Sequence, residues 1–352
     1  MKNLFLLAVL VMAFAAGACA QLPDKQDVAE AQYRVYGVAF YNLENLFDTI
    51  NANGTYDLEF SPEGAREWDS RKYWSKINRI ATTIAAMTNP ATPYGPAVVG
   101  VAEVENESVM QDLVNADPIA ARGYRVVHHD SPDRRGIDVG LLYNPAFFTL
   151  INVTNHRLDV GFPTRDQMCV TGTMGGDTVA VIVNHWPSRL GGQQRSSVHR
   201  EAAAALCKQI ADSLWQVNPN IGVIIMGDLN DDPFDKSCAE VLGARRSPDG
   251  VKPHGFFNPW WETLDNGAGT LSYRGNWNLF DQIIVSGNLL GDNVSSPERL
   301  RFWSHRINDF DFLKNGEGPY KGTPHRTYAG GAWLDGYSDH FPTEIFLVQQ
   351  VR

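Results

Sequence analysis

Residues 221–231 read Ile-Gly-Val-Ile-Ile-Met-Gly-Asp-Leu-Asn-Asp, an apolar run that ends abruptly in acids and an amide. Residues 336–342 read Gly-Tyr-Ser-Asp-His-Phe-Pro and place an acid beside an imidazole. Unpaired carboxylates at the end of a buried strand are costly. We therefore predict that the two segments, although far apart in the sequence, form one site at neighbouring strand ends. That arrangement suits metal-assisted attack of water on phosphate.

Four further segments combine an apolar run with polar groups, and in each we expect a strand that ends at the polar residues. They read Phe40-Tyr41-Asn42-Leu43-Glu44-Asn45, Val101-Ala102-Glu103-Val104-Glu105-Asn106, Val183-Asn184-His185-Trp186-Pro187 and Leu279-Phe280-Asp281-Gln282-Ile283. Oxygen donors dominate the six segments, which points to a hard cation such as Mg²⁺ or Mn²⁺. The set contains no cysteine and only two imidazoles, which argues against structural zinc.

Strand-like and helix-like runs alternate along the chain, which favours an α/β protein whose sheets are covered by helices. Strands are predicted at residues 33–41, 97–102, 124–128, 139–143, 178–183, 221–226, 281–286 and 343–348, and helices at 73–87, 108–116 and 198–216. We expect 139–143 to lie antiparallel to the region near 152–158. The Gly-, Pro- and Trp-rich stretch 248–275 is predicted to be a long surface loop.

The first 20 residues have the features of a secretory signal peptide: a lysine, an apolar run and an Ala-x-Ala cleavage site ending at Ala20. Cleavage there would export the protein to the periplasm or the extracellular space, and Cys19 leaves a lipoprotein open. The apolar run is too short for a comfortable membrane span. No second stretch could cross a bilayer, so we expect a soluble mature protein without stable membrane insertion. We also expect a monomer.

Composition limits the class of partner. The full chain has a formal net charge of −10, and loss of the leader's single lysine makes it −11. This acidity argues against a protein that grips nucleic acid through a broad basic face, although not against an enzyme that meets phosphate through a metal ion. Cys169, Cys207 and Cys238 remain after cleavage, so at most one disulfide is expected.

The ordered motifs from Asn42 to His340 resemble the endonuclease/exonuclease/phosphatase superfamily, which includes deoxyribonuclease I-like enzymes. Each motif alone is weak, but Gly-Asp-x-Asn and Ser-Asp-His together, with the Asn and Glu motifs upstream, are specific. The resemblance implies an α/β four-layer sandwich of two packed mixed β-sheets flanked by helices. It also implies that residues 21–352 form a single catalytic domain.

The resemblance implies a metal site that binds Mg²⁺ (or Mn²⁺). Glu103 corresponds to the principal metal-binding glutamate of the family, and Asn42 to the amide beside it. Asp339 resembles the family's metal-proximal aspartate. Glu44 lies where some members place a second acidic neighbour of the metal and others do not.

The resemblance also implies the catalytic roles. Asp228 matches the aspartate that orients or deprotonates the attacking water, and Asn230 the amide that holds this water and a phosphate oxygen. His340 matches the imidazole that contacts the scissile phosphate, with Asp281 on its far nitrogen. His185 corresponds to a second histidine of deoxyribonuclease-like and phosphatase-like members, where abasic-site endonucleases usually have an amide.

Arginines next to these motifs suggest local binding of an anionic substrate in an acidic chain. Arg135 and Arg189 are the candidates, and the alternative is that they pair with neighbours and brace their loops. Asp231 and Asp232 are interpreted as turn or cap residues rather than ligands. Asn106 is expected to cap the helix that begins near residue 108.

The sequence thus predicts an exported, divalent-metal-dependent phosphoesterase, with a nuclease as the leading hypothesis and nucleic acid or another phosphoester as its partner. An inositol-phosphate phosphatase or a phospholipid phosphodiesterase of the same fold is the alternative. A binding module that has lost catalysis is more remote, because the whole set of catalytic residues is present.

Overall fold

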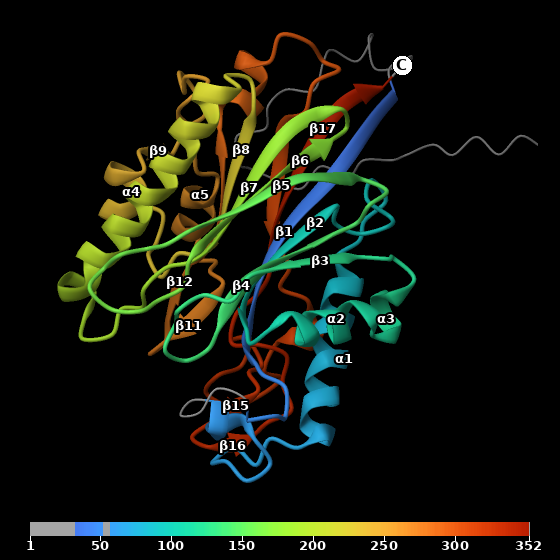
Figure 1. Ribbon diagram of the computed structural model, residues 1–352, viewed down its shortest axis with the longest axis vertical. Coiled ribbons are helices and arrows are strands. Elements are labelled where there is room, and N and C mark those ends of the chain that lie inside the picture. Colours follow the sequence, from blue (N-terminus) through green and yellow to red (C-terminus); the bar gives the residue numbers. More distant parts are fainter. Residues whose placement is uncertain (1–31, 52–56, 352) are drawn as a thin grey trace, which may run out of the picture.

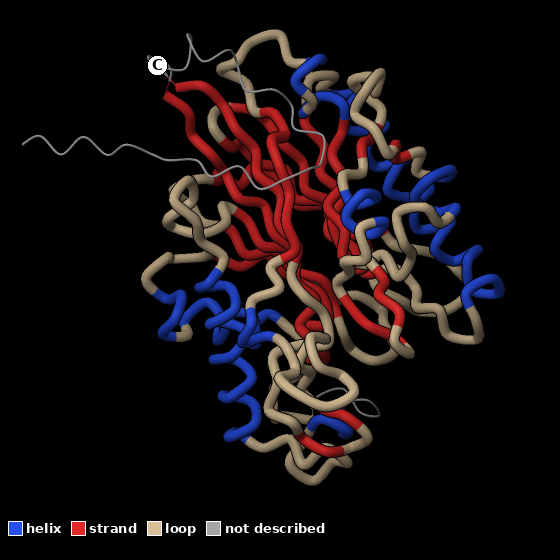
Figure 2. The backbone as a smooth tube through the Cα atoms, turned by 180° about the vertical axis from the view of Figure 1, so that it is seen from behind, coloured by secondary structure: helices blue, strands red, loops and turns tan. Residues whose placement is uncertain are grey.

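The computed structural model describes residues 32–51 and 57–351 and contains two large β-sheets packed face to face (Figures 1 and 2). The first sheet has the strand order β14-β17-β1-β2-β4-β3. Its strands are β1 (Gln32–Leu46), β2 (Val98–Val104), β3 (Arg125–His128), β4 (Asp138–Tyr143), β14 (Arg301–Ile307) and β17 (Thr343–Val351).

The second sheet has the order β5-β6-β7-β8-β13-β10-β9. Its strands are β5 (Phe148–His156), β6 (Gln167–Met174), β7 (Asp177–His185), β8 (Gly222–Asp228), β9 (Ala244–Arg245), β10 (Phe256–Phe257) and β13 (Asp281–Ser286). Two small hairpins stand apart from both sheets: β11 (Leu271–Tyr273) with β12 (Asn276–Asn278), and β15 (Tyr328–Ala329) with β16 (Ala332–Trp333).

Helices cover the outer face of each sheet, as Figure 2 shows on its two sides. The first sheet carries α1 (Ser70–Ala86), α2 (Glu107–Asn115) and α3 (Asp117–Ala120), and the second carries α4 (Gln193–Val217) and α5 (Trp260–Asp265). Three apolar clusters fill the layers, one between the sheets and one beneath each set of helices. The central strands are covered on both faces, which explains their near-continuous apolar sequences. The predicted four-layer sandwich is confirmed.

Strand direction brings the polar segments to one edge. β1 runs parallel to β2, and β7 runs parallel to β8, so the residues that end these strands lie together. β13 and β17 run antiparallel to β8 and β1. Their first residues therefore reach the same edge, which lies toward the hairpins in Figure 1. The predicted strand 281–286 is confirmed as β13. Asp281 therefore begins a strand, opposite Asp228, and does not end one as its motif suggested.

Two other predictions about the fold were also wrong. β4 and β5 do not pair: β4 lies between β2 and β3, whereas β5 pairs with β6 in the other sheet. The connection between them crosses from sheet to sheet, which alternating polarity cannot reveal. The stretch 248–275 is only partly a surface loop, because it contains β10 and α5 and buries Trp260 completely.

Helix positions are close to those predicted. α1 and α2 begin within three residues of expectation, and the Asn106 side chain caps α2 by accepting a hydrogen bond from the Val109 amide. α4 begins five residues earlier than expected, directly after Gly192.

Cys169, Cys207 and Cys238 are buried free thiols. Within the described ranges no helix has the length and apolarity needed to cross a membrane. The predicted signal peptide and Cys19 lie outside the described residues.

Candidate active site

Asp228 lies at the centre of the site, at the end of β8. Its side chain is almost fully buried, and its Oδ2 accepts a hydrogen bond from Asn42 Nδ2 at 3.0 Å. Its Oδ1 accepts the backbone amide of Asn230 at 3.0 Å. Burial, together with the negative charges of Asp281 and Glu103, raises the pKa of Asp228 to about 7. A carboxylate with this pKa is suited to accept a proton near neutral pH.

The backbone adopts left-handed conformations at four of the polar residues that surround Asp228. The φ angles are 50° at Glu44, 51° at Asn45, 61° at Glu103 and 51° at Asn230. Non-glycine residues rarely adopt such angles, and their concentration at one place is typical of functional sites. At Glu44, Asn45 and Glu103 these angles coincide with register shifts inside β1 and β2, whereas Asn230 follows the end of β8.

His340 forms an ion pair with Asp281. His340 Nδ1 lies 2.6 Å from Asp281 Oδ2, and the aspartate is completely buried. Burial alone would lower the pKa of His340, but the charge and hydrogen bond of Asp281, with Asp228 and Asp339, raise it well above its ordinary value. Ser338 fixes the segment by accepting the His340 amide and donating to the Asn42 carbonyl. His340 is therefore an imidazolium at neutral pH.

His185 faces the same carboxylate from the other side. Its Nε2 lies 3.6 Å from Asp228 Oδ2 and 3.9 Å from Glu103 Oε1. Its buried Nδ1 has no hydrogen-bond partner among the described residues. Burial and the positive charges of Arg165, Arg135 and His340 hold the pKa of His185 well below its ordinary value. His185 is therefore neutral at neutral pH.

Glu103 and Arg135 meet at the open side of the site. Glu103 Oε2 accepts the Asn45 amide at 2.9 Å and lies 3.4 Å from Arg135 Nη2. The same guanidinium donates a short hydrogen bond to Asn45 Oδ1, and 40% of the Arg135 side chain is exposed. The structure thus places Arg135 beside the catalytic centre and accessible to a ligand.

Glu44 and Asp339 lie on the opposite side, joined by Arg326. This arginine contacts Glu44 Oε1 at 3.4 Å and Asp339 Oδ2 at 2.7 Å. Glu44 also accepts the Thr327 amide at 2.6 Å and lies 3.8 Å from the buried Lys76 ammonium. Burial and the charge of Asp339 raise the pKa of Glu44. Both carboxylates are thus paired with cations in the structure, and a metal-binding role for them stays a prediction.

Arg189 is surrounded by carboxylates. It forms ion pairs with Asp231, Asp232 and Asp235 at 3.3, 3.3 and 2.7 Å, and its Nε donates to the Asn230 carbonyl at 2.8 Å. These contacts match the alternative in which the arginine braces its loop, and they hold the backbone of Asn230. Asp231 and Asp232 contact this arginine and the turn around them, as their interpretation as turn residues predicted.

The donor set of this edge fits a hard divalent cation. Glu103, Asp228 and the Asn42 amide supply oxygen atoms. The pKa of Asp228 is raised by burial first and then by the nearby charges of Asp281 and Glu103, and a cation would offset both effects. Asp228, Asp281 and His340 also lie close enough to hold an ion. However, His340 cannot bind a metal ion through Nε2 while that nitrogen carries a proton. We therefore favour the side of Glu103.

Sequence reasoning missed a residue that positions the site. Arg165 is buried and donates to the carbonyls of His185 and Trp186 and to Asp133. Asp133 in turn accepts the backbone amide of Arg135. Arg165 therefore links the His185 segment to the Arg135 loop. It stands in a stretch without a motif, so no signal in the sequence could have singled it out.

Comparisons with known proteins agree with this geometry. A family model described as Endonuclease/Exonuclease/phosphatase family matches residues 37–349. No curated protein matches the sequence. Many solved structures are similar, and three of them illustrate the range. Humanized D. rerio TDP2 has a TM-score of 0.55 and 14% identity, over 89% of this chain and 98% of that chain. D. rerio TDP2 complexed with single strand DNA product has a TM-score of 0.54 and 15% identity, over the same shares.

The third is a mannosyl-6-phosphatase from Bacteroides thetaiotaomicron, with a TM-score of 0.51 and 17% identity, over 90% of this chain and 100% of that chain. At these identities the structural likeness shows a shared fold, while the family match covers most of the sequence and most of the described structure. This chain belongs to the endonuclease/exonuclease/phosphatase family.

Proposed function

We propose that this protein is a divalent-metal-dependent hydrolase of phosphodiester bonds, with nucleic acid as its substrate class. One observation carries the proposal: Asp228 Oδ2 lies 3.6 Å from Nε2 of neutral His185 and 3.9 Å from Nε2 of the His340 imidazolium, and burial raises the pKa of Asp228 to about 7. A base for water and a cation for phosphate are the two groups that direct hydrolysis of a phosphoester needs.

Each residue has a defined task in this reaction. Asp228 accepts a proton from the attacking water, and Asn230 holds that water through its side-chain amide. The His340 imidazolium contacts the scissile phosphate, with Asp281 fixing its orientation. Neutral His185 stabilises the leaving oxygen from the other side of Asp228. A divalent cation held by Glu103 and its neighbours would neutralise charge on the phosphate oxygens.

Nucleic acid is the favoured substrate because Arg135, beside Glu103, is exposed to an anionic ligand, and because the similar D. rerio TDP2 was solved with a DNA product. A small phosphoester is the second candidate. It is favoured by the occupation of Arg189 by three aspartates, which removes a cation that a polymer could use.

Purified mature protein tests the proposal with single-stranded DNA, RNA and an inositol polyphosphate. We expect polymer cleavage with Mg²⁺ or Mn²⁺, and none in excess chelator. Glu103→Gln should lower kcat at least about 10²-fold, the scale of a lost electrostatic group. Glu107→Gln, an exposed glutamate on α2, is the matched control and should keep its activity.

Full activity in chelator would contradict the metal-dependent mechanism. Release of inorganic phosphate from the inositol polyphosphate without polymer cleavage would favour the second candidate.

We further propose that the protein is exported and acts as a monomer. The leader sequence of residues 1–20 supports export. Mass spectrometry of the mature chain should give an N-terminus at Gln21, whereas a lipid-modified N-terminal cysteine would establish the lipoprotein alternative. Light scattering of the purified protein should give the mass of one chain, and a larger mass would contradict the monomer.

A further inference from the structure

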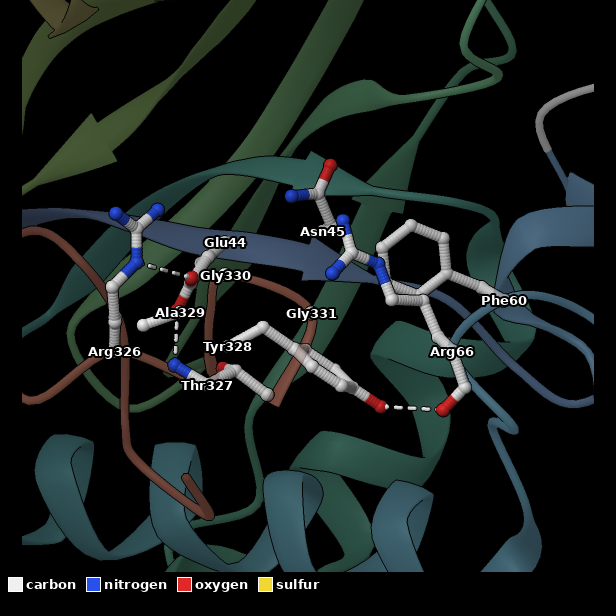
Figure 3. A pocket seen from close by; sticks show the side chains of 10 residues that line it. All are labelled: Glu44, Asn45, Phe60, Arg66, Arg326, Thr327, Tyr328, Ala329, Gly330 and Gly331. Carbon is white, nitrogen blue, oxygen red and sulfur yellow. Dashed lines mark hydrogen bonds and ion pairs between the residues drawn. The ribbon is translucent and has the colours of Figure 1, made fainter. Parts of the chain in front are cut away.

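A pocket of about 300 Å³ opens beside the catalytic centre, on the side of Glu44 (Figure 3). Its walls come from three parts of the chain that are distant in sequence. They comprise Glu44, Asn45, Phe60, Arg66, Arg326, Thr327, Tyr328, Ala329, Gly330 and Gly331. Two contacts tie it to the reaction site: the Asn45 amide donates to Glu103, and Arg326 pairs with Asp339. The proposed hydrolysis of the scissile phosphate gives the pocket itself no role.

Two arginines stand on opposite sides of this pocket in Figure 3, and both are held in place. The Arg66 guanidinium carbon lies 5.0 Å from the centre of the Tyr328 ring and 6.0 Å from that of Phe60. Its Nε pairs with Glu59 at 2.7 Å. Aromatic rings and an ion pair therefore fix the arginine before any ligand arrives.

Arg326 is fixed in a comparable way on the other side. Its Nε contacts Glu44 at 3.4 Å, and its Nη2 lies 2.7 Å from Asp339. Asp339 Oδ1 lies 3.8 Å from His340 Nε2, so this arginine is one residue removed from the imidazolium that contacts the phosphate. A guanidinium has more N–H donors than such partners occupy, and its geometry matches phosphate oxygens.

The aromatic residues of the pocket do not offer a stacking platform. Phe60 stacks on Phe47 with ring centres 4.6 Å apart, and Arg66 lies over both Phe60 and Tyr328. Lys72 also lies 5.9 Å from the centre of the Tyr328 ring. Because these faces are covered, the pocket presents two guanidinium groups rather than open rings. Glu44, the carboxylate among its lining residues, is already paired with Arg326 and with the Lys76 ammonium. Its chemistry fits an anionic group better than a base or a sugar ring.

We propose that this pocket binds a second phosphate of the substrate, next to the phosphate that is hydrolysed. The proposal rests on the proposed function, since it assumes that the first phosphate is bound at His340. Arg66 and Arg326 grip the second phosphate from two sides, while the Gly330–Gly331 turn leaves room for it, because no neighbouring atom lies within 4 Å of a Cβ built at either glycine. The second phosphate comes either from the next nucleotide of a strand or from a small polyphosphorylated molecule.

Matched substrate pairs test this proposal. The first pair is a dinucleotide with and without a terminal phosphate, and the second is an inositol bisphosphate and an inositol monophosphate. We expect the wild-type protein to prefer the member with the extra phosphate by about tenfold in kcat/KM, through KM rather than kcat, as a charge-assisted hydrogen bond allows. The pair that shows the preference identifies the source of the second phosphate.

Arg66→Gln should abolish this preference and leave the rate on the member without the extra phosphate within about twofold. Arg66→Lys should keep part of the preference, because it retains the charge. Arg71→Gln is the control: this exposed arginine lies 4.5 Å from the centre of the neighbouring Trp333 ring but does not line the pocket. Thermal melting shows whether each variant is folded. A preference that survives Arg66→Gln, or that is absent in the wild-type protein on both pairs, would overturn the proposal.

A measurement of binding affinity without turnover tests the pocket independently of the proposed hydrolysis. Calorimetry in excess chelator compares the dinucleotide with and without its terminal phosphate, so no turnover is required. The phosphorylated form should bind about tenfold more tightly to the wild-type protein, and equally to Arg66→Gln. Equal binding of both forms to the wild-type protein would reject the pocket. A wild-type protein that binds selectively but hydrolyses no phosphoester would reject only the proposed function.

Discussion

The two sides of Asp228 carry the same kind of side chain in opposite charge states. On one side, His340 pairs with buried Asp281 and is held as an imidazolium. On the other, His185 has no partner for its Nδ1 among the described residues, and burial, with the positive charges of Arg165 and Arg135, keeps it neutral. Their Nε2 atoms lie 3.9 and 3.6 Å from the same Oδ2 atom of Asp228.

This difference shows that the role of each imidazole is set by its surroundings rather than by its identity. A permanent cation suits contact with the phosphate, whereas a neutral imidazole can exchange a proton. Both histidines lie beside the carboxylate of Asp228, so a change in the charge of one should shift the pKa of the other. Substitution of Asp228 should therefore have the largest effect, and substitutions of the histidines and of their partners smaller ones.

The largest loss is expected from Asp228→Asn, which removes the carboxylate that both histidines face. The variant has no base for the attacking water, and kcat should fall about 10³-fold, within the usual range for a positioned general base. Steady-state kinetics on the best substrate measures this loss. Asp212→Asn, an exposed aspartate on α4, is the control and should be indistinguishable from wild type. Near-normal turnover of Asp228→Asn would show that another group activates the water.

The next effect comes from the histidines themselves. His340→Gln and His185→Gln should each lower kcat at least about 10²-fold. Their pH profiles should differ. In the wild-type protein, activity falls as pH rises through the raised pKa of His340, and this alkaline limb should disappear only in His340→Gln. The same alkaline limb in both variants would contradict the assigned charge states.

A smaller effect is expected from Asp281→Asn, because Asp281 acts through His340. The loss of its charge lowers the pKa of His340 toward the ordinary value. The alkaline limb of the rate profile should therefore move to lower pH, with kcat reduced about tenfold at neutral pH. Asp292→Asn, an exposed aspartate elsewhere, controls for the change in net charge. An unchanged pH profile would mean that Asp281 has only a structural role.

The smallest effect is expected from Arg165→Gln, which removes a positive charge that helps to keep His185 neutral. Without this positive charge, the pKa of His185 should rise toward its ordinary value. Protonation of His185 should then add to that of Asp228 and make the acid limb of activity steeper. Turnover near neutral pH should fall only about threefold to tenfold, from small displacements of the His185 segment. Arg157→Gln, an exposed arginine, should leave the acid limb unchanged. A steeper acid limb in the control would point to a nonspecific charge effect.

Local patterns predicted most of the central fold. Apolar runs located the strands that became β2, β7, β8 and β13 to within three residues at each end. Peripheral strands were less visible: β14 is half-buried along its whole length, so it has no clear apolar run. The sequence pattern could not predict which strands pair. β5, the strand after β4, looks like its antiparallel neighbour in the sequence but belongs to the other sheet.

The same contrast holds for the site. Its members at strand ends were predicted, and the structure brings Asn42, Glu103, His185 and Asp228 together. The arginines were harder. Arg135 and Arg189 look alike in sequence, each beside a motif, but only Arg135 remains accessible while Arg189 is bound by three aspartates. The partners of an arginine depend on the folded loop around it.

The sequence by itself determined which chemical groups are present and that they stand at strand ends, because side-chain type and apolar periodicity are local properties. Only the tertiary structure decided their charge and occupation. The pKa of His340 depends on Asp281, 59 residues away, and Glu44 meets Arg326 across 282 residues. Burial and through-space charge set these properties, and both exist only once the two sheets have packed together.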